Sequence, residues 1–310
     1  MENTRAKTTR NSLILLLTAT IWGMAFVSQS KGMDYMHPFT FNGVRSLIGA
    51  AGILVYILIS RKIAGDKAAK LDWKLNVRAG LLCGIFLTIA STLQQFGIKY
   101  TSVGKAGFIT TLYIIFVPMF GIFLKKKVAP VVWAAAGMAA VGMYLLCMTE
   151  SLSLGAGDIM VFLCAIAFAI QIMTVDHYAA RINGAVVSCI QFTVCGVVCC
   201  IGALIWGQPT FGQLQEGLGA LLYAGVLSCG VGYTLQIVGQ KGLNPTVAAL
   251  IMSLESVIAT ISGWIAYKIG FLSTDQTLTP RQIAGCVIVF AAVILVQLPQ
   301  EWFRLGKKNA

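Results

Sequence analysis

The chain has 310 residues, of which 57% are hydrophobic and only 11% charged, and its mean hydropathy is +0.81. A soluble domain carries about 25% charged residues, so this composition excludes a soluble enzyme, a nucleic-acid-binding domain and a disordered scaffold. The formal net charge is +12, but the basic residues lie in short groups between apolar runs, which is typical of membrane proteins. Lipid is therefore the predicted surrounding of most of the chain, and no nucleic acid is expected as a partner.

Ten apolar runs follow one another, each close to the roughly 20 residues that cross a bilayer. They predict spanning helices at residues 12–31, 38–60, 78–98, 103–124, 129–149, 157–177, 184–206, 217–240, 245–268 and 281–299. The longest connection, from Arg61 to Val77, is too short for a soluble domain. Basic residues before the first run resemble a signal peptide, but no A-x-A site follows, so an uncleaved helix is predicted. The predicted fold is an all-α integral membrane protein with ten transmembrane helices.

Lysine and arginine are distributed unequally between the two sides of these ten spans. With the N-terminus inside, seventeen lie on the inner side, and Arg45 lies within the second run. The five on the outer side are Lys31, Lys99, Lys105, Lys268 and Arg281. Because short cytoplasmic loops carry the excess of positive charge, both termini are predicted to be cytoplasmic.

A weak internal repeat relates the two halves of the chain. At an offset of 142 residues, Thr-Leu-Gln recurs at 92–94 and 234–236. The aligned positions are Gln94 with Gln236, Gly97 with Gly239, Tyr113 with Glu255 and, at an offset of 146, Trp22 with Phe168 and Arg45 with Gln191. The repeat predicts a division into residues 1–149 (helices 1–5) and 150–310 (helices 6–10). Since each half has an odd number of spans, the second copy is inverted, as in secondary transporters.

Several motifs in this order resemble the EamA-like branch of the drug/metabolite transporter superfamily. They are Trp22-Gly23 in the first helix, Arg45 in the second, the stretch from Gly97 to Phe108, and Leu254-Glu255 in the ninth. The resemblance covers nearly the whole chain. It implies a bacterial cytoplasmic-membrane carrier for small metabolites, often an exporter. It also implies a central cavity lined by helices 1–4 and 6–9, with helices 5 and 10 outside it.

Two places depart from the pattern of that family. Family members often have proline after the acid of helix 9, whereas here Ser256 follows Glu255. Many also end helices 4 and 9 with Gly-Glu, whereas this chain has lysines at 125–127 and Tyr267-Lys268. We expect the departures to affect local helix shape and gating contacts, and not the fold. Pro118 within the fourth run is expected to remove a backbone hydrogen bond and bend that helix.

Charged side chains at bilayer depth are costly, so each is a candidate functional residue. Burial disfavours the charged form of a carboxyl group, so Glu255 is a candidate proton or cation site; the alternative is a carboxyl held by a helix–helix hydrogen bond. Arg45 is a candidate ligand for a substrate carboxylate through its planar guanidinium; the alternative is a structural ion pair or a contact with a carbonyl group that fixes the second helix. If both face one cavity, a zwitterion such as an amino acid would find both partners.

Amides, aromatic rings and a hydroxyl complete the predicted substrate site. An amide in lipid must be hydrogen-bonded, so each faces protein or water, and interhelical hydrogen bonding remains an alternative to substrate contact. The predicted substrate-binding residues are Trp22, Arg45, Gln94, Tyr113, Gln171, Gln191, Gln236 and Glu255.

Neither a cofactor nor a metal is expected, and the chain is not predicted to be an enzyme. The two histidines, His37 and His177, lie near helix ends, and the nine cysteines form no CxxC pair. Asp158 follows Gly155 and Gly157 and is predicted to cap a helix N-terminus. One buried acid and two peripheral histidines do not supply the catalytic constellation that an intramembrane enzyme requires.

The predicted function is a secondary transporter, acting as an exporter, with alternating access around a central cavity. No G-x-x-x-x-G-K-[ST] loop is present, so a gradient must supply the energy. Proton coupling through Glu255, uniport and exchange all remain open. The main alternative is a multidrug exporter for lipophilic cations, using Glu255 with Trp22, Phe26 and Phe108 while Arg45 faces away. A channel is a third possible function.

Overall fold

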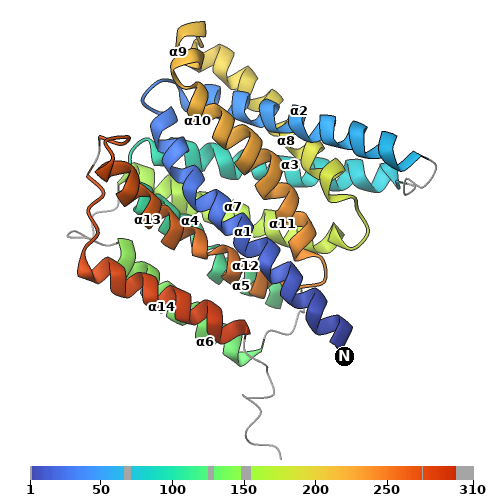
Figure 1. Ribbon diagram of the computed structural model, residues 1–310, viewed down its shortest axis with the longest axis vertical. Helices are drawn as coiled ribbons and strands as arrows, with labels where there is room; N and C mark the ends of the chain where they lie inside the picture. The colour runs from blue at the N-terminus through green and yellow to red at the C-terminus, as the bar shows by residue number, and fades with distance from the viewer. Residues whose placement is uncertain (1, 66–70, 125–128, 148–154, 274, 298–310) are drawn as a thin grey trace, which may run out of the picture.

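The computed structural model describes residues 2–65, 71–124, 129–147, 155–273 and 275–297, and every regular element within them is helical (Figure 1). Eight segments are long and apolar enough to cross a membrane, by length and composition. They are Lys7–Gly32, Pro38–Ala64, Trp73–Ile98, Val103–Phe123, Ala156–Ala179, Gly184–Gly207, Leu218–Gln240 and Pro245–Lys268. The chain is therefore a multi-pass helical membrane protein.

The fifth and tenth predicted spans correspond to shorter apolar helices, Pro130–Gly142 and Pro280–Leu295. The predicted runs, 129–149 and 281–299, end in residues outside the described ranges. The total of ten spans therefore stays a prediction, whereas the other eight predicted runs each overlap one candidate span.

The helices follow the predicted order along the chain. The first half contains α1 (Glu2–Gly32), α2 (Pro38–Ala64), α3 (Trp73–Ile98), α4 (Val103–Thr111), α5 (Tyr113–Phe123) and α6 (Pro130–Cys147). The second begins with α7 (Ala156–Ala179), α8 (Gly184–Gly202), the π-helical η2 (Ala203–Gly207) and the short α9 (Phe211–Glu216). It continues with α10 (Leu218–Leu222), the π-helical η3 (Tyr223–Gly232), α11 (Tyr233–Gln240), α12 (Pro245–Met252), α13 (Leu254–Lys268) and α14 (Pro280–Gln297).

Polar caps determine where several of these helices begin. The side chains of Asp72, Ser102, Asn183 and Asn244 each accept a hydrogen bond from a backbone N–H two or three residues further on, at 2.9–3.3 Å. Each bond satisfies an N–H group that the first turn of a helix leaves without a partner. The caps lie at the ends of apolar runs, which explains why the predicted starts lie close to the observed ones.

Helices from the two halves pack against each other rather than forming separate bundles. The most extensive pairs are α2 with α8, α3 with α7, α6 with α14, α3 with α8, and α1 with α13. In Figure 1, α6 and α14 lie side by side at one edge, away from α2 and α8. We call the end of the bundle where α1 begins the proximal end, and the end where α1 stops the distal end.

Two spans are interrupted at nearly equivalent points of the repeat. The fourth span breaks at Leu112, between α4 and α5, and its counterpart breaks at Ser253, between α12 and α13. The interruption lies six residues before Pro118, and α5 continues through the proline, so no helix break is found at the position where the bend was expected.

Serine hydroxyls replace the absent proline at the second break. The Ser253 hydroxyl donates to the Leu250 carbonyl at 2.7 Å, and the Ser256 hydroxyl donates to the Ser253 carbonyl at 2.8 Å. Such bonds compete with the helical pattern and bend helices. The interruption at Ser253 is therefore present even though serine, and not proline, follows Glu255.

Candidate functional site: the central cavity

A cavity of about 30 Å³ lies at the centre of the bundle. Its walls come from α1, α2, α3, α4, α5, α7, α8, η3, α11 and α13. No described residue of α6 or α14 is part of this lining, in agreement with the expected place of helices 5 and 10 outside the cavity. One water molecule needs at least about 10–15 Å³, so the cavity in this conformation holds only a few waters.

Seven of the eight predicted substrate-binding residues line this cavity. They are Trp22, Arg45, Gln94, Tyr113, Gln171, Gln236 and Glu255. Arg45 and Glu255 thus face one cavity, although they lie 210 positions apart in the sequence.

Gln191 is the exception. It is fully buried on α8, but it is not among the cavity residues, and its amide nitrogen and oxygen have no hydrogen-bond partner in the described part of the chain. The neighbouring Phe192 lines the cavity instead. Successive side chains on an α-helix point about 100° apart, so the orientation that brings Phe192 to the cavity turns Gln191 away.

Tyr113 and Glu255, the pair related by the repeat, meet in the cavity wall. The Tyr113 hydroxyl donates to Oε1 of Glu255 at 3.0 Å, and both residues are buried. They lie in the first turns of α5 and α13, directly after the two helix breaks. The first turn of a helix presents unpaired N–H groups and a partial positive charge, which suits the carboxyl group of Glu255.

Arg45 has no acidic partner in the described residues. Its side chain is 5% exposed, its guanidinium carbon lies 5.3 Å from the Phe41 ring centre, and its Nε has no hydrogen-bond partner. The alternative role predicted from the sequence, a structural ion pair, therefore finds no carboxylate there. The indole nitrogen of Trp22 is a second buried donor for which the described residues offer no acceptor. The Trp22 ring centre lies 4.5 Å from that of Tyr233.

The amides of the cavity bridge helices as well as lining it. Gln171 on α7 and Gln236 on α11 exchange two hydrogen bonds, of 3.2 and 3.5 Å. Gln94 on α3 donates to the Thr110 hydroxyl on α4 at 3.2 Å. These side chains therefore make the helix–helix hydrogen bonds that were one alternative and also line the cavity, whereas substrate contact stays a prediction.

Several polar cavity residues were missing from the sequence prediction, among them Gln29, Ser46, Ser91, Ser228 and Tyr233. A serine or threonine in an apolar run is a weak indication of a binding site, because its hydroxyl can donate a hydrogen bond to a carbonyl of its own helix. Tyr233 was the most accessible to prediction, since it directly precedes the repeated Thr-Leu-Gln triplet. Of the aromatic residues named for a cation exporter, Trp22 and Phe26 line the cavity and Phe108 does not.

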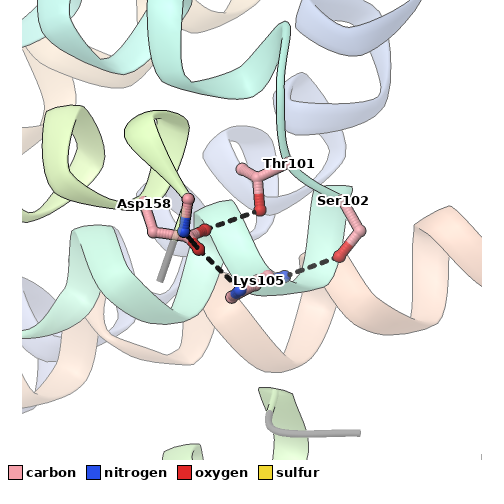
Figure 2. A network of polar contacts seen from close by, with 5 residues as sticks. Thr101, Ser102, Lys105 and Asp158 are labelled. Carbon is pink, nitrogen blue, oxygen red and sulfur yellow. Dashed lines mark hydrogen bonds and ion pairs between the residues drawn. The ribbon is translucent and has the colours of Figure 1, made fainter. Parts of the chain in front are cut away.

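An ion pair joins the two halves at the distal end (Figure 2). Asp158 accepts a hydrogen bond from the backbone N–H of Gly155 at 2.9 Å, which confirms its predicted capping role. It also accepts one from the Thr101 hydroxyl at 3.0 Å, and it pairs with Nζ of Lys105 at 2.6 Å. The ion pair was not predicted, because Lys105 was assigned to the charge of the outer loops.

Neutral hydrogen bonds connect the halves at the proximal end. The side-chain amide of Asn11 donates to the carbonyl of Lys241 at 2.8 Å. The side-chain oxygen of Asn76 accepts from the backbone N–H of Asn183, also at 2.8 Å. The cavity therefore lies between two sets of contacts, each of which crosses from one half to the other.

Histidine and cysteine form no candidate metal cluster in the described ranges. His37 lies outside the spans and packs against the rings of Phe39 and Phe96. Burial lowers the pKa of His37, and the nearby charge of Lys99 lowers it further. The neutral imidazole accepts a hydrogen bond from the Phe39 N–H at 3.4 Å and caps α2.

Comparison with known proteins supports the same fold and identifies the family. Similar proteins include uncharacterized transporters from Archaeoglobus fulgidus (28% identical over 92% of this chain and 84% of that one) and Clostridium kluyveri (22%, 91% of each). The uncharacterized transporter YwfM of Bacillus subtilis is 24% identical over 92% of this chain and 93% of its own. One solved crystal structure, 16% identical, has a TM-score of 0.73 and covers 96% of this chain and 99% of that chain. The EamA-like transporter family model matches residues 10–148 and again residues 155–298. The chain therefore belongs to the EamA-like transporter family, and it is a membrane transporter rather than an enzyme.

Proposed function

We propose that this transporter exports a small zwitterionic metabolite, such as an amino acid, by alternating access around the central cavity. The observation that carries the proposal is the pairing in one cavity of Arg45, which has no acidic partner in the described residues, with Glu255. A zwitterion presents a carboxylate to the first and an ammonium group to the second.

The chemistry of the unpaired donors supports a carboxylate ligand. A buried guanidinium without a partner is costly, because water no longer solvates it. A carboxylate can accept two parallel hydrogen bonds from arginine, and the unpartnered indole N–H of Trp22 lines the same cavity. Substrate binding would thus supply acceptors to donors that have none among the described residues.

The small volume of the cavity supports a transport cycle with helix movement. At about 30 Å³ the cavity cannot hold an amino acid, so the structure corresponds to a contracted conformation. Separation of the distal contacts around Lys105 and Asp158, or of the proximal contacts around Asn11, would open it toward one side at a time. The breaks at Leu112 and Ser253 provide points where the adjoining helices can bend.

A proton gradient is the proposed energy source. The sequence has no nucleotide-binding loop, and Glu255 is the one carboxyl group among the cavity residues. Binding of a proton and of a substrate ammonium group at Glu255 would be mutually exclusive. Such competition couples proton entry to substrate exit.

The distribution of basic residues supports an orientation with both termini in the bacterial cytoplasm. The proximal end, which holds most of the basic residues, would then face the cytoplasm. Substrate would enter from that end and leave at the distal end.

A lipophilic-cation exporter is the second candidate, and the aromatic rings of Trp22 and Phe26 in the cavity favour it. Arg45 argues against it. The guanidinium lines the cavity, where its charge would repel a cationic substrate at short range in a medium of low dielectric constant.

Counterflow in proteoliposomes tests the proposal. Vesicles that contain the purified protein are preloaded with unlabelled amino acids, and uptake of the labelled counterpart is measured with and without a pH gradient. The proposal expects saturable, selective exchange that a pH gradient accelerates. Gln191→Met, a change at a buried polar residue outside the cavity, serves as a control and should retain exchange. Transport of lipophilic cations without amino-acid exchange would overturn the proposal.

A further inference from the structure

Two hollows lie next to each other at the proximal end, away from the central cavity. The first measures about 250 Å³ and combines three cationic residues, Lys7, Arg10 and Lys241, with apolar ones such as Ile237. The second measures about 330 Å³ and includes Arg61. Both hollows are lined by Gly184 and Val238. We call the two joined hollows the basic groove.

The basic groove lies at the depth of lipid headgroups. Lys7 begins the first candidate span, Gly184 begins another, and Lys241 directly follows the span that ends at Gln240. Phospholipid phosphates occupy this level, and long basic side chains commonly reach it from helix ends. Tyr56, which also lines the groove, is 61% exposed, as is typical of tyrosine at a membrane interface.

The cations of the basic groove have no carboxylate ion-pair partner among the described residues. Within the described residues, the hydrogen bonds of the Arg10 guanidinium go to the side chain of its neighbour Asn11, at 3.4 and 3.5 Å. Two lysines of the distal end differ, because Lys31 pairs with Asp34 and Lys105 pairs with Asp158.

The described acidic residues on the surrounding helices do not line the groove. Asp72 caps α3 through the N–H of Leu75, and Asp176 on α7 is not among the residues that line either hollow. Within the described part of the chain, the groove therefore combines positive charge that no carboxylate pairs with and an apolar wall, in which Val238 is 40% exposed.

We propose that the basic groove binds an anionic phospholipid. Its phosphodiester lies among Lys7, Arg10 and Lys241, and its acyl chains extend along Val238, the exposed apolar residue that both hollows share. Charge complementarity selects an anionic headgroup, because basic pockets between transmembrane helices at the membrane surface attract anionic lipids. The inference does not depend on the substrate of the central cavity.

The position of the groove gives the lipid a role in the transport cycle. Lys7 and Arg10 belong to the first half of the chain, and Lys241 belongs to the second. The carbonyl of Lys241 is also the acceptor of the proximal hydrogen bond from Asn11. A phosphodiester that bridges these cations therefore stabilises the closed arrangement of the proximal end.

Lipid titration of the purified full chain tests the proposal. Phosphatidylglycerol is added in steps to protein in phosphatidylcholine nanodiscs, thermal stability is recorded, and native mass spectrometry counts the retained lipids. We expect phosphatidylglycerol to raise Tm and to remain bound. The triple variant Lys7→Gln, Arg10→Gln, Lys241→Gln should weaken that binding by at least about tenfold.

Two controls make the outcome decisive. The distal variant Lys99→Gln, Lys268→Gln removes two cations outside the groove and should bind phosphatidylglycerol as the wild type does; equal weakening would mean non-specific attraction and would overturn the proposal. Inorganic phosphate and glycerol phosphate, at matched ionic strength, should not displace the lipid. Displacement by either would identify a site for soluble anions instead. The Tm of the triple variant in phosphatidylcholine alone should equal that of the wild type, which separates lost lipid binding from misfolding.

Discussion

Arg45 and Glu255 differ in how the protein accommodates them at the centre of the bundle. Glu255 accepts a hydrogen bond from the Tyr113 hydroxyl and lies in the first turn of α13. Arg45 packs over the ring of Phe41 and has no carboxylate partner in the described residues. The carboxyl group is therefore accommodated by the fold itself, and the guanidinium is left available for a ligand. These differences lead to separate predictions for the two residues.

Glu255→Gln should abolish the acceleration of exchange by a pH gradient. The amide oxygen still accepts from Tyr113, so the fold is kept, but the side chain no longer takes up a proton. Tyr113→Phe removes only the donor and leaves the buried carboxyl group of Glu255 without it, so it should lower the free energy of unfolding by about 1–3 kcal/mol while retaining the response to the gradient. Counterflow with and without a gradient measures both effects. If the Glu255→Gln variant still responds to the gradient, Glu255 is excluded as the proton site.

Arg45→Lys should weaken substrate binding without destabilising the protein. Lysine keeps the charge but loses the planar guanidinium that binds a carboxylate through two hydrogen bonds, so the half-saturation concentration should rise about tenfold or more. Arg45→Gln should leave Tm in the absence of substrate unchanged or higher, because it removes an unpaired buried charge. A large fall in Tm would instead identify Arg45 as a structural residue.

At the scale of elements, the paired helix breaks bring Tyr113 and Glu255 together. Both residues begin new helices, and their side chains meet across the repeat. The two breaks have different local chemistry, since serine hydroxyls act at the second. This difference predicts which substitutions the second break tolerates.

Ser256→Pro should fold and transport close to wild-type levels. Residue 256 lies in the first turn of α13, where the φ angle of proline is tolerated. The substitution removes one backbone hydrogen bond, from the Ser256 N–H to the Ser253 carbonyl at 3.1 Å, which contributes only about 1 kcal/mol. Thr260→Pro is the matched control one turn later, in the helix interior, and should cost about 3 kcal/mol or more. Thermal melts in detergent and counterflow compare the two variants. Equal damage by both would mean that α12 and α13 act as one continuous helix.

The ion pair between Lys105 and Asp158 connects α4 to the start of α7 across the two halves. Asp158→Asn retains an acceptor for the N–H of Gly155 but loses the charge, and Lys105→Met loses the other partner. Since Asp158 is buried and Lys105 only partly exposed, a double-mutant cycle should give a coupling energy of about 1–3 kcal/mol. A coupling near zero would show that the contact does not hold the distal end together.

For the whole molecule, the central question is how a contracted cavity between two interleaved halves opens. Helices of one half pack mainly against helices of the other, as in the pairs α2–α8 and α3–α7. Relative movement of the halves therefore changes the cavity directly. Cross-half contacts close both ends in this conformation.

The proposed orientation predicts which residues react from outside the cell. Asp275→Cys, at the distal end, should be labelled by a membrane-impermeant maleimide in intact cells, whereas Lys241→Cys, at the proximal end, should react only after permeabilisation. The wild-type protein supplies the background from native cysteines. The reverse pattern would place both termini outside.

Local composition was enough to predict much of this protein. Apolar runs located the eight long spans, because a segment that crosses a bilayer must satisfy its backbone internally and present apolar side chains. Buried polar residues were recognisable as site candidates for the same reason, since Arg45 or Gln236 in an apolar run must face protein or water. The family could also be identified from a few motifs in order.

Tertiary packing decided the rest. Gln191 and Phe192 are neighbours in sequence, and only the rotation of α8 against α2 and α3 determines that the phenylalanine reaches the cavity. Lys105 and Asp158 lie 53 positions apart, so no local pattern indicates their ion pair. The cavity itself exists only where ten structural elements converge. Sequence alone therefore determined which residues lie in the membrane and which polar residues are costly to bury there. The tertiary structure determined which of these polar residues meet, because helix rotation and register depend on side chains distant in the chain.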